Sequence, residues 1–147
     1  MVNMTPWPMP LKTLLRLLIV AEILLGGLGA ALDIALEPRL PEPLRSYLAA
    51  DSESWSTTDN IMLCIGIPTL IATIVSWIGL WRLWPSARPI YLYSCVAGVL
   101  LVAFLGPSVS SAVGTMFSEG AMLVAGFILG LIYFSDLRHA FERAKTN

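Results

Sequence analysis

The sequence predicts an all-α protein, an integral membrane four-helix bundle with both ends of the chain on the cytoplasmic side. Hydrophobic residues make up 56% of the 147 residues and charged residues only 13%, against about 25% charged residues in a typical soluble domain. The apolar residues fall into long runs that can each cross a membrane. Most basic residues lie in segments that these runs place on the same side of the membrane. The net charge of −1, without a large basic patch, argues against a nucleic-acid partner.

The first predicted span covers residues 14–36, which exceeds the roughly 20 residues that an apolar helix needs to cross a bilayer. Lys12 and Arg16, followed by Gly29-Ala30-Ala31, also fit a cleaved signal peptide. The apolar run is longer than the usual signal core of about 7–15 residues, and it carries Glu22 in its middle. We therefore expect a helix that is retained.

The other three spans are predicted at residues 61–81, 90–105 and 120–134. Residues 37–59 form a polar, acidic loop on the external face, and residues 108–119 form a short turn. Pro68 lies inside the second span and should bend it, because proline removes a helical hydrogen bond. We expect residues 1–147 to form a single membrane domain.

The direction of the chain follows from its basic residues, because cytoplasmic flanks carry an excess of lysine and arginine. All but two of the nine basic residues fall on one side of the predicted spans. That side holds Lys12, Arg16, Arg82, Arg88, Arg138, Arg143 and Lys145, whereas Arg39 and Arg45 lie on the other. We expect a multi-pass protein of the cell inner (plasma) membrane, with both termini cytoplasmic.

Glu22 is the most informative residue, because an ionisable group within a bilayer points by default to function or to a partner. It should lie about 12 Å deep, at 1.5 Å per residue. The helical period places it on one stripe with Gly26, Gly29 and Asp33. A matching stripe of the second span contains Gly66, Thr69, Thr73 and Ser76.

Small residues and hydroxyls promote packing between membrane helices, so we expect the first two spans to pack on these two stripes. Three interpretations of Glu22 are open. A protonated carboxyl can bond Thr69 or Thr73 and hold the helix pair together, it can contact a partner protein, or it can serve as a transport site for a proton or cation. Asp33 should be solvated or paired with Arg39 or Arg45.

The fourth span contains Gly126-x-x-x-Gly130, which suits either dimerisation or packing within the bundle. No enzyme motif, metal-ligand spacing or cofactor site is found, and the chain has a single histidine, His139. Cys64 and Cys95 should lie near opposite faces of the bilayer as free thiols.

Two short motifs resemble those of known membrane proteins. Val20-Ala21-Glu22-Ile23 resembles the first helix of small multidrug-resistance transporters, which implies a proton-coupled role for Glu22. The pattern Gly79-Leu80-Trp81-x-x-Trp84-x-x-Ala87-Arg88, with Tyr91 and Ile132-Tyr133-Phe134-Ser135, resembles uncharacterised small four-helix bacterial inner-membrane proteins. The second resemblance implies a fold and no activity.

From these observations we expect a non-enzymatic membrane protein that acts through helix–helix contacts, as an accessory subunit, an assembly factor or an immunity-type protein. The alternative is a small oligomeric transporter or channel in which Glu22 is the intramembrane proton or cation site. The expected partners are the lipid bilayer and either another membrane protein or a second copy of the chain.

Overall fold

The computed structural model of the protein describes residues 10–39, 41–46, 57–104, 110–138 and 141. These residues form helices and their connections, with no β-strand among them, which confirms the predicted all-α class. The helices are α1 (Leu11–Leu36), a short 3-10 helix η1 (Glu37–Arg39), α3 (Thr57–Trp81), α4 (Ala87–Phe104) and α5 (Ala112–Phe134).

Three of these helices are long and apolar enough to cross a membrane. They are α1, the part Leu63–Trp81 of α3, and α5. The apolar stretch of α4, Ala87–Ala103, is shorter. The described structure therefore belongs to a helical protein with the composition of a membrane protein.

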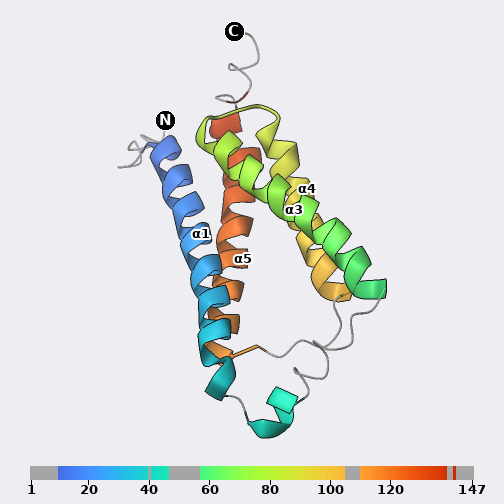
Figure 1. The fold of residues 1–147 in the computed structure, drawn as a ribbon. Coiled ribbons are helices and arrows are strands. Elements are labelled where there is room, and N and C mark those ends of the chain that lie inside the picture. The colour runs from blue at the N-terminus through green and yellow to red at the C-terminus, as the bar shows by residue number, and fades with distance from the viewer. Residues whose placement is uncertain (1–9, 40, 47–56, 105–109, 139–140, 142–147) are drawn as a thin grey trace.

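The helices lie in two pairs. The first helix packs along α5 and α3 packs along α4, and the two pairs diverge from one another (Figure 1). The expected packing of the first two spans against each other is therefore wrong, because the long partner of α1 is α5. Contacts of α1 with α3 and of α4 with α5 are few by comparison.

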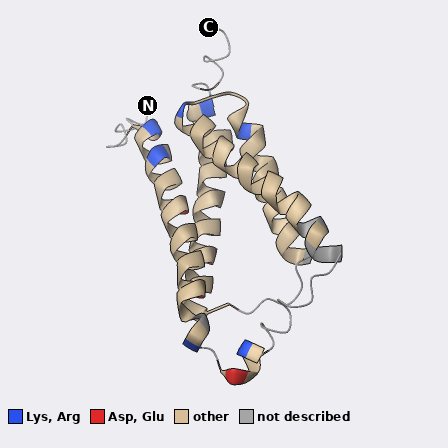
Figure 2. Cartoon of the chain, in the orientation of Figure 1, with Lys and Arg blue, Asp and Glu red and all other residues tan. Residues whose placement is uncertain are grey.

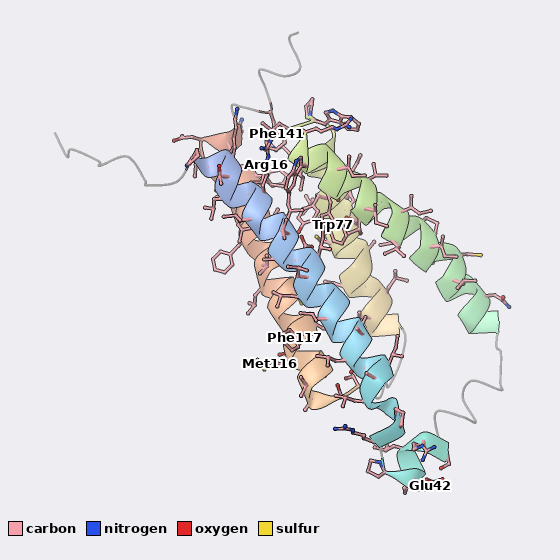
Figure 3. All side chains as sticks on the ribbon, turned by 60° about the vertical axis from the view of Figure 1, so that its left-hand side comes forward. Arg16, Glu42, Trp77, Met116, Phe117 and Phe141 are labelled. Carbon is pink, nitrogen blue, oxygen red and sulfur yellow. The ribbon has the colours of Figure 1, made fainter. Side chains whose placement is uncertain are left out.

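One end of the molecule, which we call the closed end, holds the start of α1, the α3–α4 turn and the described residues after α5, 135–138 and 141 (Figure 1). Its buried core comprises Leu15, Ile19, Leu80, Ala87, Tyr91, Ile128, Ile132, Leu137 and Phe141. At the other end, which we call the open end, the pairs stand apart. Figure 3 labels Arg16, Trp77 and Phe141 toward the closed end, with Met116, Phe117 and Glu42 toward the open end.

The turn between α3 and α4 brings these helices together at the closed end. Leu83 has a positive φ of 59°, and the Trp84 N–H donates to the Gly79 carbonyl at 2.8 Å. This arrangement is a Schellman motif, which usually has glycine at the left-handed position. Leu83 packs instead against the core, and this burial offsets the cost of roughly 1–2 kcal/mol for a left-handed backbone.

One predicted helix start is wrong. The last helix begins at Ala112 rather than at residue 120, because Ser111 caps it and accepts a 2.9 Å hydrogen bond from the Gly114 N–H. The segment expected to be a turn is thus largely helical. The second long helix begins at Thr57 and continues through Pro68 to Trp81.

Candidate functional site

Glu22 lies where three helices meet. Its side chain is only 9% exposed, and its Oε2 atom accepts hydrogen bonds from Trp77 Nε1 at 3.1 Å and from the Tyr91 hydroxyl at 2.9 Å. The indole belongs to α3 and the phenol to α4. A single carboxyl oxygen therefore connects α1 to both helices of the other pair.

The environment of this carboxyl is apolar. Ile19, one turn before Glu22, and Tyr91 are fully or almost fully buried, and Cys95, one turn beyond Tyr91, is partly buried against the same core. Both cysteines are free thiols, as predicted. Among the described residues Glu22 makes no salt bridge, so neutral hydrogen-bond donors alone hold it.

The hydrogen-bond partners of Glu22 differ from those expected. The Thr69 hydroxyl donates to the Ile65 carbonyl at 2.8 Å, and the Thr73 hydroxyl donates to the Thr69 carbonyl at 2.9 Å. Both bonds stay within α3. Glu22 instead lies level with Trp77, one turn nearer the closed end than Thr73.

The glycines of α1 and α3 divide into two groups. A Cβ atom added at Gly29 would lie 2.7 Å from Ser118 Oγ and 3.2 Å from the Gly114 carbonyl oxygen, both of α5. Gly29 therefore does serve close packing, as its helix stripe predicts, but against α5. At Gly26 and Gly66 nothing lies within 4 Å of such an atom.

Gly126 and Gly130 likewise have no neighbour within 4 Å of an added Cβ atom. They line an open hollow of about 470 Å³ along α5, together with Leu123, Phe127, Leu131, Phe134 and Ser135. This glycine pair does not pack against another described helix of the chain, so its role in dimerisation stays a prediction.

Asp33 caps the start of α5. Its Oδ1 atom accepts hydrogen bonds from the backbone N–H and the hydroxyl of Ser111, both at 2.8 Å. A Cβ atom at Gly114 would collide with the Asp33 carboxylate. The expected pairing with Arg39 or Arg45 is not found among the described residues, and Asp33 is only partly exposed. The free N–H groups and the dipole of a helix N-terminus attract this carboxylate.

Only threonines were expected as partners of Glu22 within the chain, and its bonds to Trp77 and Tyr91 were missed. The positions of these two residues beside the α3–α4 turn could have identified them as partners of one carboxyl. Trp77 lies four residues before the last residue of α3, and Tyr91 four residues after the first residue of α4. In a tight antiparallel hairpin these residues lie at the same depth, so two polar aromatic groups can reach one carboxyl.

No family model, no curated protein and no solved structure matches this chain. The two resemblances drawn from short motifs therefore stay predictions. The Glu22 carboxyl accepts two hydrogen bonds, from Trp77 and Tyr91. Such a carboxyl can hold helices together or exchange a proton. Across the described part of the chain, no three His, Cys, Asp or Glu side chains gather to hold a metal ion.

Proposed function

We propose that the protein crosses the inner (plasma) membrane four times, with both termini in the cytoplasm. The 18 residues of α4 would span about 27 Å at 1.5 Å per residue, close to the roughly 30 Å of a hydrocarbon core. Basic residues gather at the closed end (Figure 2), which supports a cytoplasmic location of that end. Arg143 and Lys145, which also entered this argument, lie outside the described residues.

Reporter fusions test this topology. Fusions after Arg45 and after Ser110 should report an external position, and fusions after Ser86 and at Asn147 should report the cytoplasm. A cytoplasmic signal after Arg45 would reverse the proposed orientation.

The function that the geometry supports best is that of a non-enzymatic membrane protein acting through helix–helix contacts with another membrane protein. It would serve as an accessory subunit, an assembly factor or an immunity-type protein. The observation that carries this proposal is the unequal joining of the two helix pairs, which are tied at the closed end and separate at the open end.

Three glycines on the open-end side of Glu22 have no packing neighbour. Gly26 on α1, Gly66 on α3 and Gly98 on α4 each have empty space where a Cβ atom would lie. Small residues let membrane helices approach closely, and lipid chains do not require them. These positions favour a helix from another membrane protein as the missing neighbour.

Bulky substitutions at the open end test this proposal. Gly66→Leu combined with Thr69→Leu should leave the folded chain intact, because Gly66 has no neighbour within 4 Å. The same variant should lose a stoichiometric partner in mild detergent and should reproduce the phenotype of gene deletion. Ile71→Phe is the control, since Ile71 is 55% exposed on the same helix and adds bulk outside the small-residue stripe. A variant that keeps both partner and activity would contradict the proposal.

One observation favours the alternative, a small oligomeric transporter or channel. Glu22 lies at the joint between the two pairs, where a change of its proton could alter the angle between them. The test is Glu22→Gln, which keeps the shape of the side chain but cannot gain or lose a proton. A variant that folds normally yet behaves like the gene deletion would move the transporter to first place.

A further inference from the structure

A narrow apolar groove runs between α1 and α3 beside the closed end. It has a volume of about 240 Å³ and is lined by Ile19, Val20, Ile23, Trp77, Ile78, Trp81 and Arg82. All of these except Arg82 are apolar or aromatic. Four of the lining residues, Val20, Ile23, Ile78 and Trp81, are exposed, so the groove is open to the surroundings of the bundle.

The basic end of this groove carries two guanidinium groups. Arg82 lines the groove itself, and Arg16 lies over the Trp81 ring, 5.2 Å from its centroid. Both arginine side chains are exposed. Neither forms a salt bridge within the described part of the chain, so their charges are available to an outside anion.

These features together define the chemistry of an occupant, which must be thin and apolar along most of its length and anionic at the end near Arg16 and Arg82. A protein helix is about 10 Å or more across with its side chains and is too wide to enter the groove between α1 and α3. One acyl chain of a phospholipid is thin enough, and its headgroup would lie at the level of the basic residues.

We propose that this groove is a binding site for an anionic phospholipid. One acyl chain lies between α1 and α3 against Ile23 and Ile78, and the phosphate is bound by Arg82 and Arg16. The tryptophans at 77 and 81 form the wall on the α3 side. This site is separate from the partner-binding face proposed for the open end, and it does not depend on that proposal.

The test uses the full-length chain in mild detergent, incubated with an equimolar mixture of phosphatidylglycerol and phosphatidylcholine. Native mass spectrometry measures how much of each lipid the protein retains. The wild-type chain should retain phosphatidylglycerol preferentially. Arg82→Gln and Arg16→Gln should each weaken this binding about five-fold, as expected for one basic side chain at an anionic headgroup.

Two further variants separate the groove from general charge. Ile78→Trp should expel the lipid by filling the groove, whereas Met122→Trp, on an exposed face of α5, should retain it. Arg39→Gln, at the open end, removes one positive charge just as Arg82→Gln does. Because Arg39 lies away from the groove, this variant should leave lipid retention unchanged.

Three results would overturn the proposal. They are equal retention of the two lipids by the wild-type chain, an equal loss in Arg39→Gln and Arg82→Gln, and full retention in Ile78→Trp. Melting temperatures measured without added lipid show that each variant is folded, so that loss of lipid cannot be mistaken for loss of structure.

Discussion

The closed and open ends are built from the same helices yet are stabilised differently. At the closed end, Arg88 lies over the Tyr133 and Phe141 rings, 4.7 and 5.7 Å from their centroids, and Glu22 bonds both α3 and α4. At the open end each pair is held only within itself, as Asp33 and Ser111 show for α1 and α5. The pairs therefore join where these polar and aromatic contacts coincide with the buried apolar core.

The largest expected effect concerns the residues that follow α5. Phe141 is fully buried at the closed end, whereas Phe127 is 69% exposed on α5. Phe141→Ala should lower the free energy of unfolding by about 3–5 kcal/mol, as for a fully buried phenylalanine. Phe127→Ala should change it by about 0.5 kcal/mol or less. Denaturation by SDS in mixed micelles measures both, and equal effects would remove the distinction between the two ends.

Two glycines of α3 should respond with opposite signs. A Cβ atom at Gly79 would lie 2.6 Å from the Cβ atom of Ala87, whereas Gly66 has open space around it. Gly79→Ala should destabilise the protein by about 1–3 kcal/mol through overpacking. Gly66→Ala should stabilise the isolated chain by about 0.5–1 kcal/mol, since alanine favours the helix. A stabilised Gly79→Ala variant would show that the α3–α4 turn is looser than described.

Glu22 separates the roles of hydrogen bonding and charge. Glu22→Leu removes the acceptor of Trp77 and Tyr91 and should cost about 1–2 kcal/mol. Glu22→Gln should be close to wild type in stability and activity, because its carbonyl oxygen can accept both bonds. Its amide nitrogen would replace Oε1, which has no hydrogen-bond partner among the described residues. Melting temperature and the deletion phenotype are measured together, and a glutamine variant as unstable as the leucine variant would show that the charge itself matters.

The smallest expected effect concerns two arginines that flank the α3–α4 turn. Arg88 is held over two aromatic rings and its buried Nε has no hydrogen-bond partner in the described structure, so Arg88→Met should cost about 1 kcal/mol of cation–π attraction. Arg82 lies over Trp84 alone, 5.7 Å from the ring centroid, and is exposed. Arg82→Met should cost about 0.5 kcal/mol or less. The reverse order of melting temperatures would contradict this assignment.

Composition and periodicity were sufficient to predict the helical class and to single out Glu22, because a carboxyl within an apolar run is costly wherever the chain folds. They did not identify the partner helix of α1. Residues 108–119 were expected to form a turn, so Gly114 and Ser118 were never considered as helix-packing positions. They are the two residues that meet Gly29, and a single misplaced helix start therefore concealed the correct pairing.

The partners of Glu22 were missed for a different reason. Threonines are the usual hydrogen-bonding residues between membrane helices, but those of α3 bond their own backbone. Tryptophan and tyrosine are typical of the membrane–water interface. Only the tight turn between α3 and α4 brings Trp77 and Tyr91 to one carboxyl. Local sequence patterns do not show which side chains lie at the same depth as Glu22. That depends on how α1 is aligned with the distant α3–α4 hairpin.

The bond from Asp33 to Ser111 joins residues 78 positions apart and has a consequence for biogenesis. The ribosome synthesises α1 long before α5. The carboxylate of Asp33 therefore cannot bond Ser111 until α3 and α4, which pack against each other, have already been made. The last long helix then completes the pairing begun by the first. A truncated chain that ends before Ser111 should therefore leave α1 exposed to chaperones and proteases of the membrane, although every residue of α1 has already been made.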